Sequence, residues 1–170
     1  IIMVRTQNAW IALLGGLIIG AIVGYIVGTI VTRLEIPAFL VTLAISSIAS
    51  GGIMVITRGT KIKDLGDFTM FGKGSIGPIG ISVLMMFLTM SICHILLAKS
   101  SFGRKVYAVG GNRAAAIASG IDAGRVIRMV YVIDGVTTAL AAVLFMSRLG
   151  SGQPNAGQGY AFDAITGAVV

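Results

Sequence analysis

The sequence predicts an all-α polytopic membrane protein. Apolar residues make up 56% of the 170 residues and charged residues only 11%, whereas about a quarter of the residues of a soluble domain are charged. The apolar residues gather in four blocks, each near the roughly 20 residues that a membrane-spanning helix needs. We therefore expect the chain to form part of a single transmembrane domain, with spans at about 9–31, 36–57, 79–98 and 126–147.

The first predicted span has no charged residue, lies between Arg5 and Arg33, and begins with Trp10, an aromatic residue typical of the membrane interface. Four glycines recur at every fourth position and so share one stripe of the helix: Gly16, Gly20, Gly24 and Gly28. Such a stripe predicts close packing against the backbone of a neighbouring helix. A pore lined by glycine is the alternative interpretation.

The second predicted span follows a connection of very few residues, so we expect it to run antiparallel to the first. Pro37 suits the first turn of this helix. The middle of the span is small and polar, and its members could face a partner helix or a water-filled path: Ser46, Ser47, Ser50, Gly51 and Gly52.

Residues 58–78 contain charges and five glycines and predict a solvated loop. Gly72 and Lys73 resemble the end of a phosphate-binding loop, but Gly74 stands where such a loop needs Ser or Thr to bind Mg²⁺. We therefore expect no nucleotide site, and hence no bound cofactor.

The third and fourth predicted spans carry the few chemically reactive residues. Cys93 and His94 are single and adjacent, which favours a packing role over catalysis, and no cluster has metal-ligand spacing. No catalytic residue and no metal site is predicted. Asp134 is a carboxylate within a span, which by default suggests a functional role. It lies less than two turns from Arg128, where interfacial water could reach it, and this position favours a structural role.

Residues 148–163 form a glycine-rich polar segment without an acid–base pair. Its neutral hydrogen-bonding side chains suit either a polyhydroxylated solute or a capped turn: Gln153, Asn155, Gln158 and Tyr160. Both ends of the chain look cut, because residue 1 is not Met and the apolar tail 165–170 is too short to span a membrane. We expect an interior piece of a longer chain.

The longest hydrophilic interval, residues 99–128, carries six of the 13 lysines and arginines and one acid. Its density of positive charge favours a cytoplasmic location, although the totals of Lys and Arg on the two sides of the membrane are nearly equal. Within it, Asn112 is a good N-cap, residues 113–119 predict two helical turns, and Gly120 suits the left-handed position after them. This alanine-rich helix could dock on another protein or lie on the membrane surface.

Residues 102–112 (FGRKVYAVGGN) and 148–160 (RLGSGQPNAGQGY) resemble the permease subunit of bacterial ABC importers for monosaccharides, the ribose, xylose, galactose and arabinose group. The resemblance implies that residues 99–125 form a cytoplasmic coupling loop. It implies contact with a separate ATP-binding subunit through Gly111, Asn112, Ala115, Ala116, Ser119, Gly120 and Ile121.

The same resemblance implies a multi-pass protein of the bacterial inner membrane that works with a second permease chain, a periplasmic or lipid-anchored sugar-binding protein and membrane lipid, but not with nucleic acid. Family members often carry acids at the positions of Arg113 and Ala114 and a basic residue at that of Ile117. Because this chain has none of these, we expect docking by shape rather than by a specific salt bridge.

The function expected from the sequence is therefore that of the translocation subunit of an ATP-driven sugar importer, a transport subunit and not an enzyme. Its solute path would include Gln153, Asn155, Gln158, Tyr160, Ser46 and Ser50. One alternative is an ion- or proton-coupled secondary transporter that uses Asp134 and His94. Another is a membrane scaffold whose basic loop binds anionic lipid or a cytosolic partner.

Overall fold

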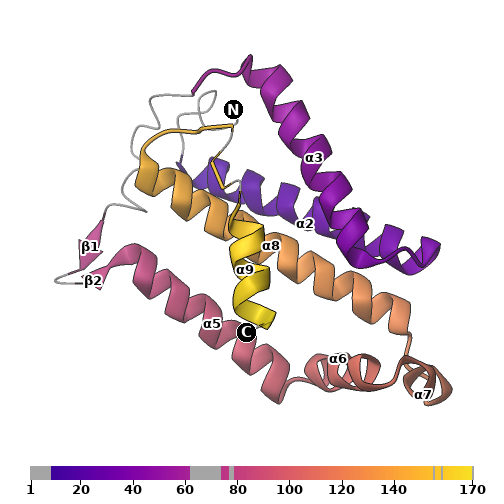
Figure 1. The fold of residues 1–170 in the computed structure, drawn as a ribbon. Helices are drawn as coiled ribbons and strands as arrows, with labels where there is room; N and C mark the ends of the chain where they lie inside the picture. Colours follow the sequence, from indigo (N-terminus) through magenta and orange to yellow (C-terminus); the bar gives the residue numbers. More distant parts are fainter. Residues whose placement is uncertain (1–8, 62–73, 77–78, 155, 158, 170) are drawn as a thin grey trace.

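A computed structural model describes residues 9–61, 74–76, 79–154, 156–157 and 159–169. The described part is a bundle of helices with one small hairpin of two-residue strands (Figure 1). The elements are α2 (Ala9–Leu34), α3 (Ala38–Thr57), β1 (Ser75–Ile76), β2 (Ile79–Gly80), α5 (Ile81–Lys99), α6 (Ser101–Gly111), α7 (Arg113–Ala118), α8 (Ala123–Leu149) and α9 (Tyr160–Val169).

Four of these helices, α2, α3, α5 and α8, are long and apolar enough to cross a membrane. The all-α polytopic fold class is therefore confirmed. The helix ends differ from the expected ranges by at most three residues. For example, α8 begins three residues before residue 126, and α5 begins only after the strand β2. Most large apolar side chains on these helices are exposed in the chain alone, as expected for surfaces that face lipid or other helices.

Helices α2 and α8 form the tightly packed centre of the described structure. The glycine stripe of α2 lies directly on the backbone of α8: a Cβ atom at Gly24 would overlap the carbonyl oxygen of Tyr131, and one at Gly28 would come within 2.9 Å of the Cα atom of Arg128. At the other end of α2, Gly16 faces Val143. The two helices are thus antiparallel, and the close packing predicted from the glycine spacing is confirmed.

Helix α3 diverges from α2 after a short connection (Figure 1). Only Val41, close to that connection, is buried. Pro37 has a ψ of 128° and is the N-cap of α3, so its expected place in the first helical turn was wrong. Its extended backbone keeps it outside the helix, and its carbonyl accepts the first bond, from the N–H of Leu40 at 3.0 Å.

Helices α5 and α6 meet at a sharp elbow at Ser100. Gly103 is buried there, and a Cβ atom on it would overlap the carbonyl oxygen of Leu97. Only glycine allows the first turn of α6 to lie so close to the last turns of α5. The elbow therefore fixes the direction in which α6 leaves the spanning helix.

Between α3 and α5, Ser75 pairs with Gly80 and Ile76 with Ile79 in the antiparallel hairpin. Most of the predicted solvated loop, including the Gly72–Lys73 pair, lies outside the described residues. At the other end of the chain, α9 begins at Tyr160, five residues before the apolar tail expected to start the next span. The glycine-rich segment is therefore shorter than expected.

Candidate functional site

The hydrophilic interval between α5 and α8 is folded into consecutive capped helices at one end of the bundle (Figure 1). Each of α6, α7 and α8 begins with a polar side chain that accepts a hydrogen bond from the backbone N–H three residues on. The accepting atoms and donors are Ser100 Oγ and Gly103 (2.9 Å), Asn112 Oδ1 and Ala115 (3.0 Å), and Asp122 Oδ1 and Arg125 (2.9 Å).

The short helix α7 is closed at its C-terminal end as well. Gly120 has a φ of +81°, its N–H donates to the carbonyl of Ile117 at 2.9 Å, and the N–H of Ile121 donates to the carbonyl of Ala116 at 3.0 Å. These paired bonds form a Schellman motif, in which a left-handed residue satisfies the last carbonyls of a helix. The predicted N-cap at Asn112 and left-handed Gly120 are both confirmed.

Six of the seven residues expected to contact an ATP-binding subunit are at least partly accessible. Gly111, Asn112, Ala115, Ser119 and Gly120 are exposed and Ile121 is half-buried. Ala116 is only 4% exposed, so it packs α7 against the rest of the chain. Ile117 is 54% exposed and adds a large apolar side chain to the outer surface of α7.

Helix α6 was not expected from the sequence, because its 11 residues include three glycines. Phe102, Val106 and Val109 are half-buried, whereas Arg104 and Tyr107 point outward, and Tyr107 is 67% exposed. The signal that could have revealed this helix is the spacing of its three apolar residues by four and three positions after a serine N-cap.

Exposed cations gather at the same end of the bundle. They come from the end of α2 and from α6, α7 and the start of α8: Arg33, Arg104, Lys105, Arg113 and Arg125. Among the described residues, the one ion pair joins Arg125 and Asp122 at 3.6 Å, and both side chains are mostly exposed. Such a pair contributes little stability, so this end of the chain presents largely uncompensated positive charge.

A groove of about 350 Å³ separates α5 from α8. Met85, Met86 and Met90 of α5 line it opposite Leu140 and Ala141 of α8. Methionine side chains are flexible and adapt to changes in the shape of a cavity. The α5–α8 contact is therefore much looser than the backbone contact between α2 and α8.

Among the described residues expected along a solute path, none forms a hydrogen bond with another. The hydroxyl of Ser46 on α3 donates to the carbonyl of Leu43 at 2.8 Å, and Ser50 lies one turn further along the same helix. Gln153 donates to Ser151 at 3.4 Å. Asn155 and Gln158 lie outside the described residues.

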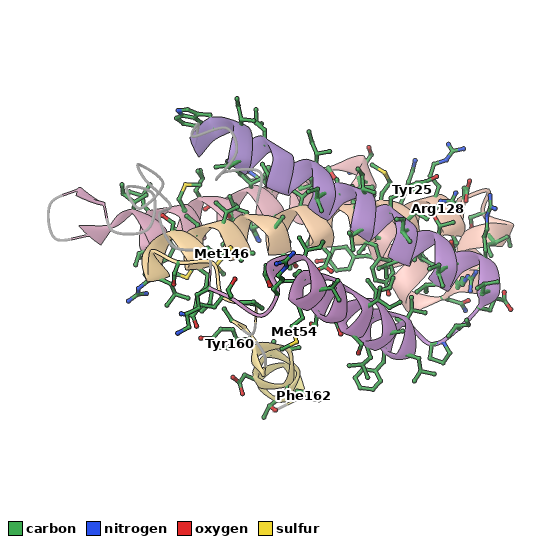
Figure 2. The ribbon with its side chains drawn as sticks, turned by 90° about the horizontal axis from the view of Figure 1, so that it is seen from above. Tyr25, Met54, Arg128, Met146, Tyr160 and Phe162 are labelled. Atoms are coloured by element: carbon green, nitrogen blue, oxygen red, sulfur yellow. The ribbon has the colours of Figure 1, made fainter. Side chains whose placement is uncertain are left out.

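Tyr160 begins α9, and its ring meets that of Phe145 edge to face, with 5.6 Å between the ring centroids. This contact attaches the start of α9 to the last turns of α8. Figure 2 shows Tyr160 at the same end of α8 as Met146, while Tyr25 and Arg128 lie toward the opposite end of the α2–α8 pair. Phe162 is 62% exposed and points away from the bundle.

Asp134 and His94 are both exposed and lie on different helices. Cys93 is half-buried on α5. In the described parts of the chain, no group of three or more His, Cys, Asp or Glu side chains could hold a metal ion. The features that remain for a functional site are the capped segment α6–α7, the groove and the polar residues of α8 and α9.

The whole chain, residues 1–170, matches the family of branched-chain amino acid transport system permease components. The chain belongs to this permease family. The four apolar helices fit a multi-pass protein of the bacterial inner membrane.

Curated relatives carry the names of sugar permeases. The permease is 41% identical to the ribose import permease protein of Bacillus subtilis over 82% of its own length and 44% of the relative. It is 33% identical to the D-allose transport system permease protein of Escherichia coli, over 94% of its own length and 49% of the relative. It is 32% identical to the L-arabinose transport system permease protein of the same species, over 97% of its own length and 51% of the relative.

The chain spans about half the length of the curated relatives that it matches. No solved structure gives a significant match to it. The resemblance to monosaccharide permeases seen in residues 102–112 and 148–160 is nevertheless confirmed by these relatives.

Proposed function

We propose that this chain is part of the translocation subunit of an ATP-driven importer for monosaccharides. The observation that carries the proposal is the similarity of 82–97% of the chain to permeases named for ribose, allose and arabinose. The family membership favours such a system over the proton-coupled secondary transporter that Asp134 and His94 suggested.

The segment α6–α7 is our candidate for the contact with a separate ATP-binding subunit. Its caps hold α7 in one geometry even though a helix of six residues is unstable alone. Its accessible small residues, Gly111, Ala115 and Gly120, would let a partner approach the backbone, and Ile117 offers an apolar anchor. Ala116, which is buried, would position α7 rather than touch the partner.

Cations rather than acids surround this segment, and Arg113 and Ala114 replace acids that are common in such permeases. Docking by shape and apolar contact is therefore the mode that we propose, with the positive charges able to attract acidic residues of the partner over a distance of about 10 Å. Membrane lipid headgroups are the second candidate for these charges.

The packing supports a mechanism in which two units shift against each other. Helices α2 and α8 are joined through their backbones, and α5 and α6 are joined by the elbow at Gly103. The methionine-lined groove lies between α5 and α8, whereas α6 contacts α8 directly. A movement of α7 driven by the ATP-binding subunit would pass through α6 to α5 and change the groove, because the elbow does not bend freely.

A second permease chain and a sugar-binding protein complete the proposed assembly. The solute path would run between permease chains or between halves of one chain, and Ser46, Ser50, Gln153, Asn155, Gln158 and Tyr160 remain candidates to line it. Neutral hydroxyls, amides and an aromatic ring suit an uncharged sugar.

The test is to purify the full-length permease with its ATP-binding subunit and its sugar-binding protein, and to reconstitute them in lipid vesicles. Ribose, allose or arabinose should stimulate ATP hydrolysis and be taken up, and a proton ionophore should leave uptake unchanged. If leucine but none of the sugars stimulates ATP hydrolysis, the substrate is an amino acid and not a monosaccharide. Uptake that needs no ATP and collapses with the proton gradient would reject the proposal.

A further inference from the structure

Asp134 lies deeper in a candidate span than any other charged side chain that the structure describes. Helix α8 carries Arg128 and Arg148, which are 20 residues, or about 30 Å, apart. This separation matches the thickness of the hydrocarbon core of a bilayer. Asp134 is six residues from Arg128 and therefore lies about 9 Å inside the core, too deep for its short side chain to reach the headgroups.

The carboxylate of Asp134 points away from the packed centre of the bundle. Helix α8 contacts α2 through Arg128, Tyr131 and Gly135, and Asp134 is turned by about 100° from Gly135 around the helix. Its side chain is exposed. Among the described residues, nothing forms an ion pair or a hydrogen bond with its carboxylate.

Contact with lipid at this position would cost up to about 3 kcal/mol on the scale of translocon insertion. A membrane helix that keeps such a residue normally gives it water or a polar partner. The neighbouring residues on α8 indicate whether Asp134 meets water or a polar partner. Thr137 and Ala141, which line the groove facing α5, lie three and seven positions after Asp134 and so continue its row along the helix.

Further along α8, the same side of the helix reaches the residues that contact α9. Phe145 lies 11 positions, or three helical turns, after Asp134 on the same side of the helix, and it holds Tyr160 edge to face. One side of α8 thus carries, in order, the Asp134 carboxylate, the hydroxyls of Thr137 and Thr138, and the ring of Phe145, which contacts Tyr160 of α9.

We propose that this side of α8 borders a water-filled solute path in the assembled permease, and that the Asp134 carboxylate accepts hydrogen bonds from hydroxyl groups of a neutral sugar near its inner mouth. A carboxylate has two acceptor oxygens and can bind neighbouring hydroxyls at once, and such charge-assisted bonds are stronger than those of a neutral acceptor. The inference rests on the proposed function as a sugar permease.

The test measures water access at Asp134 in the full-length permease, assembled with its ATP-binding subunit and sugar-binding protein in vesicles. In a background with Cys93→Ser, the variants Asp134→Cys and Val136→Cys are exposed to a membrane-impermeant thiosulfonate. Val136 is the matched control, because it is two residues away and about 200° around the helix. Asp134→Cys should react at least about tenfold faster, and saturating sugar should slow the reaction.

Equal reactivity of the two cysteines, or labelling of Asp134→Cys that sugar does not slow, would overturn the inference. A second variant covers the case in which the cysteine protein fails to assemble. Asp134→Asn keeps the size and should assemble normally but lower the apparent affinity for sugar about tenfold, because the acceptor loses its charge. Failure of Asp134→Asn to assemble would also overturn the inference, because it would indicate an ion pair between Asp134 and another segment.

The unsubstituted permease in the same vesicles separates the two proposals. If it takes up no sugar, the proposed function fails. If it takes up sugar while Asp134→Cys stays unlabelled and Asp134→Asn has unchanged affinity for sugar, only the assignment of Asp134 fails.

Discussion

Gly20 and Gly135 lie backbone to backbone where α2 crosses α8. A Cβ atom on either glycine would overlap the carbonyl oxygen of the other, so neither position admits any larger residue without separating the helices. Such reciprocal contact is typical of small residues at membrane helix interfaces, where dispersion replaces the hydrophobic effect as the driving force. This contact joins α2 and α8 through their backbones, and we propose that α5 moves against this pair.

Replacing Gly20 with valine should destabilise the permease by about 1–3 kcal/mol or more, since the added carbons overlap the Gly135 carbonyl. Thermal unfolding of the full-length protein in detergent measures the effect. Gly52→Ala is the control, because a Cβ atom at Gly52 on α3 would meet no neighbouring atom within 4 Å. The control should be neutral or stabilising by up to about 1 kcal/mol, in line with the higher helix propensity of alanine.

Gly103→Ala should loosen or open the α5–α6 elbow, because its methyl group would overlap the carbonyl oxygen of Leu97. Sugar-stimulated ATP hydrolysis should fall several-fold while basal hydrolysis by the partner subunit persists. Gly110→Ala, near the far end of α6 with open space around it, tests helix propensity alone. A Gly103→Ala protein with full stimulation would show that the elbow does not transmit the movement.

Asn112→Ala removes the side chain that accepts the Ala115 N–H at the start of α7. The loss of a capping bond costs about 1 kcal/mol, and in a helix of six residues this should appear as local fraying. Amide hydrogen exchange over residues 113–120 should become faster by roughly fivefold. Asn112→Asp and Asn112→Ser, which keep an accepting oxygen, should restore protection, and equal exchange in all variants would contradict the role of the cap.

Ala141→Trp should fill part of the groove between α5 and α8. If the two units shift against each other at this groove, uptake should slow at least several-fold although the protein still assembles. Ala142→Trp is the matched control, because Ala142 is the next residue, is also exposed and does not line the groove. Equal uptake by the two variants would remove the groove from the mechanism.

The sequence predicted the parts of this fold that depend on hydropathy and local chemistry. Four apolar blocks were enough to place four long helices, and the spacing of Gly16 to Gly28 predicted a close helix contact. The caps of α7 were predicted because Asn112 and Gly120 act on their immediate neighbours. The partner of the glycine stripe was not predictable, because helix pairing depends on the whole bundle.

Helix α6 was missed for a related reason. Gly103, Gly110 and Gly111 lower helix propensity, but Gly103 is needed for a contact with Leu97 that only the folded elbow reveals. The interfacial position expected for Asp134 stays a prediction. The structure adds that α8 starts at Ala123, 11 positions before this residue, and that the side chain of Asp134 is exposed.

The most direct test of the account compares Gly120→Val with Gly120→Asn in the reconstituted importer, because φ at Gly120 is +81° and asparagine tolerates the left-handed region far better than valine. Uptake per ATP hydrolysed should fall at least about tenfold in Gly120→Val and change little in Gly120→Asn, with both proteins assembled normally. Unchanged coupling in Gly120→Val would contradict the assignment of α7 as the segment that couples ATP hydrolysis to sugar import.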